Sequence, residues 1–177
     1  MVEVRPLALL VLSTCLLLAE AAPCQQLPAP VANLCTPSAD WGKADQAAAQ
    51  EVVNLVNERR LSAGQRTLSV DPALTAAATW KALHMARLGY LDHDDPPPPI
   101  ARSYSTRLRE CGYTGGYFGE NIGEGYRSPE KTVGGWMNSP EHRRNIESPR
   151  YTDVGAGVAQ SAEGKWYWSL DLGTRHY

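Results

Sequence analysis

GGYFGENIGEGYRSPEKTVGGWMNSPEHRRNIESP, the stretch from Gly115 to Pro149, decides which fold this chain adopts. Its first part is too rich in glycine for a helix and predicts a short strand at Asn121–Gly123. Ser128-Pro129-Glu130 and Ser139-Pro140-Glu141 then each predict a helix start, because serine is a good N-cap, proline suits the first turn and an acid favours the positive end of the helix dipole. The stretch therefore predicts one strand followed by two short helices.

Helical periodicity marks three segments before this stretch. Residues 44–62 carry apolar side chains at helical spacing and end before a glycine. A second helix begins with Asp71 as N-cap and Pro72 in its first turn, and Gly89 ends it. A shorter amphipathic helix is predicted over 100–111.

A β-hairpin is predicted after the stretch. Residues 154–158 and 166–173 alternate apolar with small or polar side chains, and the intervening segment with Gly164 makes the turn. The alternation predicts one covered and one more exposed face. Helices first and an antiparallel pair last indicate an α+β fold.

The composition indicates a single globular domain with processing segments. The chain has 177 residues, 43% of them hydrophobic, and a net charge of -2 with scattered Lys and Arg, which argues against a nucleic-acid partner. An apolar run at 7–18 followed by Ala19-Glu20-Ala21 predicts a signal peptide over 1–21. Residues 22–43 are predicted to form a linker or arm and 44–177 the domain. The mature chain is expected outside the cytoplasm, in the periplasm or the medium, as a monomer without a transmembrane segment.

Cleavage of the signal peptide would leave Cys24, Cys35 and Cys111. Three cysteines in an exported chain can close one disulfide and leave one thiol. Cys24 with Cys35 would form a local clip in the arm. Pairing of Cys111 with either arm cysteine is the alternative, and the sequence does not decide between them.

Three side chains are predicted to converge on one cleft: His93, Glu120 and His142. His93 precedes four consecutive prolines, which predict an exposed, extended loop. Glu120 lies between glycines, and His142 lies near a helix start whose dipole favours the neutral imidazole. Two imidazoles and a carboxylate are a reasonable ligand set for a divalent metal, Zn²⁺ or Mg²⁺. The hydroxyl of Ser139 is explained as the N-cap, and His84 as a residue at the edge of the core.

Five motifs occur in order along the chain: Val56-Asn57-Glu58-Arg59-Arg60, Gly89-Tyr90-Leu91-Asp92-His93, Gly119-Glu120-Asn121-Ile122, Trp136 to Arg143, and Val154-Gly155-Ala156-Gly157. Together they resemble the CAP superfamily of cysteine-rich secretory, antigen 5 and pathogenesis-related 1 proteins, most closely its bacterial SCP-like extracellular branch. The resemblance implies a three-layer α-β-α sandwich with a central twisted antiparallel sheet.

The resemblance also implies a cleft lined by two histidines and two acids that holds a divalent metal in some relatives. His93, Glu120 and His142 match three of these residues, while Asn57, Arg60 and Trp136 match structural positions. The second family glutamate is replaced by Ser139. Glu141 lies in the next turn and could substitute for it, and Asn121 is expected to line the same cleft.

Three functions are expected as alternatives, and the resemblance supports the first of them. The first is a secreted binding or effector module for a lipid, a sterol, or an envelope or protein partner, with Tyr113, Tyr117 and Tyr126 as exposed contacts. The second is a metal-assisted hydrolase or peptidase with Glu120 as general base. The third is an exported domain with a vestigial cleft.

Overall fold

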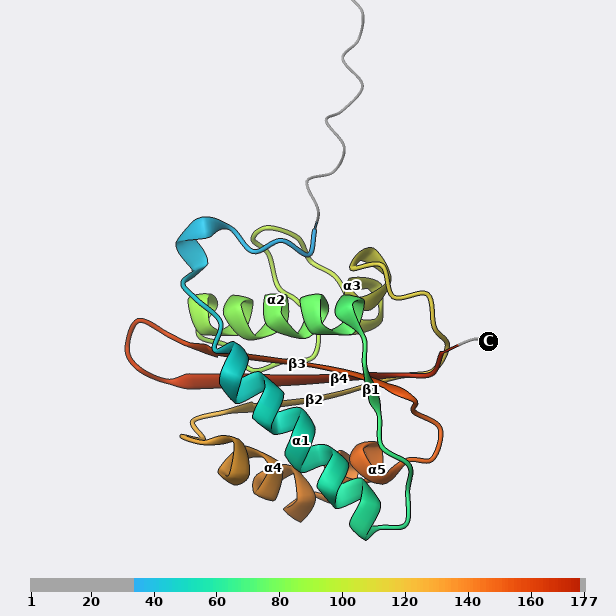
Figure 1. The fold of residues 1–177 in the computed structure, drawn as a ribbon. Coiled ribbons are helices and arrows are strands. Elements are labelled where there is room, and N and C mark those ends of the chain that lie inside the picture. The colour runs from blue at the N-terminus through green and yellow to red at the C-terminus, as the bar shows by residue number, and fades with distance from the viewer. Residues whose placement is uncertain (1–33, 176–177) are drawn as a thin grey trace, which may run out of the picture.

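The computed structural model describes residues 34–175, which form helices and strands in a mixed order (Figure 1). The predicted signal peptide and most of the predicted arm lie outside the described residues. The elements are η1 (Ala39–Trp41), α1 (Gln46–Ser62), β1 (Ser69–Val70), α2 (Pro72–Leu88), α3 (Tyr104–Glu110), β2 (Phe118–Glu124), α4 (Pro129–Asn138), α5 (Pro140–Glu147), β3 (Asp153–Gln160) and β4 (Trp166–Gly173).

One sheet lies between two layers of helices. Its strand order is β1-β3-β4-β2. Helices α2 and α3 cover one face and α1, α4 and α5 cover the other (Figure 1). This confirms the predicted α-β-α sandwich, with one correction: β2, β3 and β4 pair antiparallel, but β1 pairs parallel to β3, so the sheet is mixed. β1 contains only two residues, too few to produce a recognisable sequence pattern.

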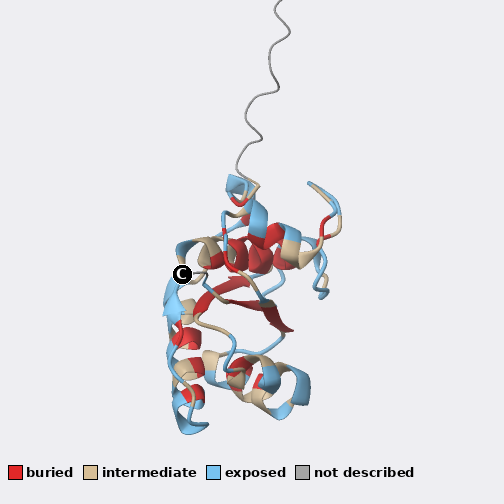
Figure 2. Cartoon of the chain, turned by 90° about the vertical axis from the view of Figure 1, so that its right-hand side faces the viewer, coloured by how far each residue is buried: buried red, intermediate tan, exposed pale blue. Residues whose placement is uncertain are grey.

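Both faces of the hairpin are buried, which corrects the prediction of one exposed face. Residues 153–159 of β3 and 167–173 of β4 are all buried, and Figure 2 shows the sheet enclosed between the helix layers. The polar side chains of Ser169 and Asp171, which alternate with the apolar residues of β4, therefore lie in the interior.

The limits of α2 agree with its predicted capping signals. Asp71 accepts hydrogen bonds from the backbone N–H groups of Ala73 and Leu74, at 2.8 and 3.2 Å. Gly89 closes the helix in the left-handed conformation, with φ of 69°. The helix is buried on more sides than predicted, and His84, expected at the edge of the core, is completely buried.

Glycines in β3 let α2 approach the sheet closely. A Cβ atom on Gly155 would clash with the backbone of α2 at Leu74 and Thr75, and one on Gly157 would clash at Ala78. Any other residue at these two positions would push the helix away from the strand. The helix–sheet interface is therefore fixed at backbone level.

The described part of the arm is fastened to the domain. Cys35 forms a disulfide with Cys111, the C-cap residue of α3, with Cα atoms 5.2 Å apart. Of the two alternatives left open by the sequence, pairing of Cys111 with an arm cysteine is the one observed. Trp41 is buried, with its ring 5.2 Å from that of Trp80 in α2. The arm therefore completes the cover of α2.

β2 is an edge strand of the sheet formed by residues 34–175, and side chains bond to its outer side. Three carbonyl groups along this edge accept hydrogen bonds at 2.9–3.3 Å: Phe118 from the Tyr151 hydroxyl, Glu120 from the Asn145 amide and Ile122 from the Trp136 indole. These donors come from α4, α5 and the segment after α5. The edge strand is therefore tied to the helical layer by specific bonds.

Asn57 and Arg60 hold loops in place. The Asn57 amide exchanges two hydrogen bonds with the backbone of Leu68, at 2.8 and 3.2 Å. The buried Arg60 guanidinium donates to the carbonyl groups of Arg66, Ile146, Ser148 and Tyr151. Both side chains therefore fasten the C-terminal part of α1 to segments that come later in the chain.

Candidate functional site

His93 and Glu120 meet directly. The His93 Nδ1 atom lies 2.7 Å from the Glu120 Oε1 atom. The His93 side chain is 49% exposed, whereas that of Glu120 is 1% exposed. The pair therefore joins a surface imidazole to an interior carboxylate that β2 holds in place.

Arg107 of α3 binds the other oxygen of Glu120. Its Nη2 atom pairs with Oε2 of Glu120, and its Nη1 atom pairs with Asp95. All three groups are buried. Buried charges are stable only when they are paired and hydrogen-bonded, and here the Glu120 carboxyl group is held between His93 and Arg107.

Lys81 positions the loop that carries His93. Its buried amine donates to the carbonyl groups of His93 and Asp94, both at 3.1 Å, and to the Asp95 carboxylate at 2.9 Å. The loop contains the proline run and has no regular structure of its own. These three bonds from α2 therefore determine where its histidine lies.

The sequence did not predict the roles of Lys81, Asp95 and Arg107. Asp95 lies in an acidic run, and Arg107 lies among other arginines of α3. Their positions in the sequence therefore do not distinguish them from charged residues at the surface. The one available signal was Lys81, which lies on the apolar side of α2 among buried residues. A lysine inside an apolar stripe requires a partner.

His142 lies at the third position of α5, as predicted, and is partly buried. Burial, and then the charge of nearby His93, lower the pKa of His142. The Asn121 amide donates to the His142 carbonyl at 3.0 Å and accepts from Asn145 at 2.9 Å, so buried Asn121 ties β2 to α5. His142 therefore lies close enough to His93 for the two imidazoles to interact electrostatically.

Ser139 and Glu141 lie at the start of α5. Ser139 is the N-cap residue of α5, but its hydroxyl makes no capping hydrogen bond, which corrects the role predicted for it. Glu141 is exposed in the first turn of α5 and raises the pKa of His142 slightly against the effect of burial. Tyr104 is an addition: its ring centre lies 6.2 Å from that of His93.

Acid groups perturb the titration of the site. The hydrogen bond that Glu120 accepts from His93 raises the pKa of His93, against the opposing effect of burial. Asp171 of β4 lies opposite Glu120 in the sheet register. Burial, and then the charge of Glu120, raise the pKa of Asp171 well above its usual value. The carboxyl group of Asp171, beside Glu120 on the neighbouring strand, therefore keeps its proton to a higher pH than an ordinary aspartate does.

The predicted three-ligand metal site is only partly compatible with these contacts. Residues 34–175 contain no group of three or more His, Cys, Asp or Glu side chains arranged to hold a metal ion. Both oxygens of Glu120 already accept hydrogen bonds from His93 and Arg107. The remaining donors are the Nε2 atom of His93 and the imidazole of His142, with the carboxylate behind the first of them. A carboxylate in that position orients a metal-binding histidine.

Among the helices of residues 34–175, none is both long enough and apolar enough to span a membrane.

Comparisons with known proteins agree with the fold. The family model described as "CAP: Cysteine-rich secretory protein family" matches residues 53–172. The uncharacterized protein YkwD of Bacillus subtilis is 35% identical over 116 residues, which cover 63% of this chain and 42% of YkwD. The chain thus spans less than half the length of this relative.

Solved structures with the same fold include extracellular proteins. An extracellular protein containing an SCP domain from Bacillus anthracis superposes with a TM-score of 0.66 at 21% identity, over 74% of this chain and 41% of that protein. The protein NaASP2, solved with Zn²⁺, superposes with a TM-score of 0.52 at 13% identity, over 75% of this chain and 82% of that one. With the family match over most of the chain, the fold and the motifs lead to one conclusion: this chain belongs to the CAP family, the cysteine-rich secretory protein family.

Proposed function

We propose that the protein is an exported CAP-domain binding module whose ligand site is formed by His93 and His142 with Glu120 behind them. Export is supported by the apolar segment at 7–18 and by the extracellular SCP-domain protein with the same fold. The site lies where β2, α5 and the loop after α2 meet, on elements that hydrogen bonds fix in place.

One observation favours binding over hydrolysis. A general base needs a free carboxylate oxygen within reach of the water that it activates. In Glu120 one oxygen accepts from His93 and the other pairs with buried Arg107. Water could reach this carboxylate only by displacing one of these partners. Glu120 therefore supports the site instead of acting as the base.

A divalent metal at this site would be held by two imidazoles, because both Glu120 oxygens already have partners. His93 Nε2 and His142 would be the ligands, and Glu120 would orient His93 through Nδ1. A metal such as Zn²⁺ would supply a positive charge for an anionic or polar ligand. Metal binding requires His93 without its proton, and Glu120 raises the pKa of His93. Affinity should therefore increase as the pH rises through that pKa.

Calorimetric titration with ZnCl₂ tests the site. We expect one-to-one binding that is lost in His93→Ala/His142→Ala and weakened about 10-fold to 100-fold in Glu120→Gln, the range typical of groups that orient metal ligands. Glu141→Gln is the control, because that exposed side chain neighbours His142 without supporting His93. Equal binding by the parent and all three variants would show that the metal binds elsewhere. No binding by any of them would show that the cleft does not bind Zn²⁺.

Exposed aromatic rings are the expected contacts with a lipid, sterol or envelope partner. Tyr117 is 65% exposed and Tyr126 37% exposed, and the Arg150 guanidinium lies 5.3 Å from the Tyr117 ring. Tyr113, expected beside them, is buried and donates to Asp153 at 2.9 Å. Sedimentation with lipid vesicles should therefore weaken in Tyr117→Ala/Tyr126→Ala. Unchanged sedimentation would exclude these two rings.

A further inference from the structure

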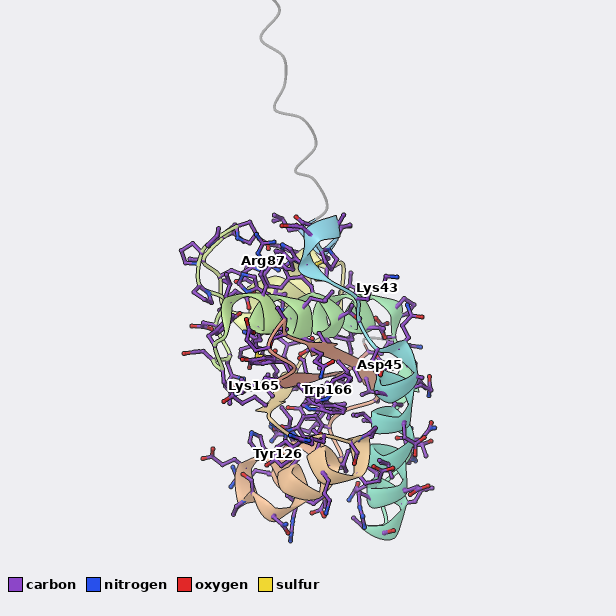
Figure 3. All side chains as sticks on the ribbon, turned by 90° about the vertical axis from the view of Figure 1, so that its left-hand side faces the viewer. Lys43, Asp45, Arg87, Tyr126, Lys165 and Trp166 are labelled. Carbon is purple, nitrogen blue, oxygen red and sulfur yellow. A yellow bond between two sulfur atoms is a disulfide. The ribbon has the colours of Figure 1, made fainter. Side chains whose placement is uncertain are left out.

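A cavity of about 330 Å³ opens at the β3 side of the sheet, across the sheet from Glu120 on β2. Ala49 and Val53 of α1 form one wall, Thr75 and Thr79 of α2 the other, and Ala156 of β3 lies between them. The cavity lies beside Asp45, which Figure 3 shows at the start of α1. It shares no lining residue with the histidine site.

The edge of β3 that faces this cavity is hydrogen-bonded to other segments at both of its ends, and this pairing is interrupted in the middle. The Val154 carbonyl accepts from the backbone N–H of Asp71 at 2.9 Å, and the Val158 carbonyl accepts from that of Asp45 at 2.8 Å. Ala156 lies midway. Because backbone groups alternate along a strand, the N–H and C=O of Ala156 point out of the same edge.

Between these two contacts, the open part of this edge is centred on Ala156. β1 ends at Val70, and the chain then turns into α2 after Asp71. On the other side Ala44 pairs with Ala159, and the chain turns into α1 after Asp45. An extended peptide that continued along the edge would collide with these segments. The opening therefore suits a small molecule and excludes an added strand.

The ligand chemistry follows from the geometry of Ala156. One strand residue presents a donor and an acceptor side by side, so its complement must also carry an acceptor and a donor side by side. A trans amide cannot form this pair of hydrogen bonds, since its N–H and C=O point in opposite directions. A lactam or a primary carboxamide can, because its N–H and C=O point to the same side. Val53 and Val70 offer apolar surface for the rest of such a ligand, and Thr79 offers a hydroxyl at the rim.

We propose that this cavity is a second binding site, independent of the histidine site, for a small ligand that carries a lactam or carboxamide group paired with the backbone of Ala156. The volume is within the range of small-molecule sites. The walls are already in place, because Gly155 and Gly157 allow the backbone of α2 to lie directly on β3. Binding therefore requires no rearrangement of the fold.

A matched pair of probes tests the hydrogen-bond pattern. The ¹⁵N-labelled protein is titrated with 2-piperidone and with N-methyl-2-piperidone, which lacks the donor, while amide resonances are followed by NMR. We expect saturable shifts centred on Ala156 with 2-piperidone, at least 10-fold weaker with the methylated probe. No saturable shift at Ala156, or equal responses to both probes, would overturn the proposal.

Variants test the location. Ala49→Phe fills the cavity and should weaken binding at least 10-fold, whereas Ala47→Phe, on the exposed face of the same helix, should not. Val70→Phe narrows the cavity from its exposed rim and repeats the test if Ala49→Phe does not fold. Equal affinity in the folded blocking variant and the control would contradict the assignment. Zn²⁺ titration of the same variants should be unchanged, which separates this site from the histidine site.

Discussion

Replacement of Cys35 and Cys111 together by serine should lower the free energy of unfolding by about 4–5 kcal/mol at 25 °C. The disulfide joins residues 76 positions apart. In the chain-entropy treatment, a cross-link over a loop of this length removes roughly 15 cal/mol/K from the unfolded chain, or about 4.5 kcal/mol at 298 K. Each kcal/mol corresponds to roughly 2–4 °C for a domain of this size, so Tm should fall by about 10–15 °C.

Urea unfolding followed by tryptophan fluorescence measures this difference. The double variant is used because a single serine would leave a thiol free to pair with Cys24. Cys24→Ser is the matched control and should unfold as the parent does. A loss below about 1 kcal/mol in the double variant, or an equal loss in Cys24→Ser, would refute the assignment of Cys35–Cys111 as the stabilising cross-link.

Three further outcomes are expected from urea unfolding. Arg107→Met should lower the free energy of unfolding by about 3–5 kcal/mol, because two buried carboxylates lose their shared cation. Arg109→Met, at an exposed position of the same helix, is the control and should change it by less than about 0.5 kcal/mol. Similar losses in both variants would contradict the role of Arg107 between Asp95 and Glu120. Asp171→Asn should leave the free energy of unfolding unchanged near pH 4 and raise it at pH 8. Burial and the neighbouring glutamate raise the pKa of Asp171, so the folded parent keeps a proton that the unfolded chain releases, and the parent loses stability as the pH rises toward the folded pKa. The same pH dependence of the unfolding free energy in the parent and the variant would argue against this. Gly155→Ala should cost about 1–3 kcal/mol through its clash with α2, whereas Gly134→Ala, with open space in α4, should stabilise by up to about 1 kcal/mol.

Local signals predicted most of the secondary structure. The caps of α2 and the Ser-Pro-Glu starts of α4 and α5 depend on neighbours in sequence, so they could be read directly. The helix predicted over 100–111 begins only at Tyr104, because Arg102 first pairs with Asp95 across the loop. That pairing is tertiary, and no local pattern reports it.

The site was predictable in part. The sequence motifs identified His93, Glu120 and His142, and the structure joins the first two by a hydrogen bond. The motifs could not predict how the Glu120 carboxylate is paired. Its pairing depends on Arg107 of another element, and Arg107 shares Asp95 with Lys81. Long-range ion pairs of this kind leave no periodicity in the chain.

The side chains that bond to the carbonyl groups of β2 have a consequence for association. An open strand edge is a template on which a second copy can add its own strand, and proteins that work at high local concentration must prevent this. Here Tyr151, Asn145 and Trp136 already use the acceptors that an incoming strand would need. Sheet extension would first have to break three bonds to the helical layer. The same contacts that anchor the strand carrying Glu120 thus oppose addition of another strand at the β2 edge of the sheet.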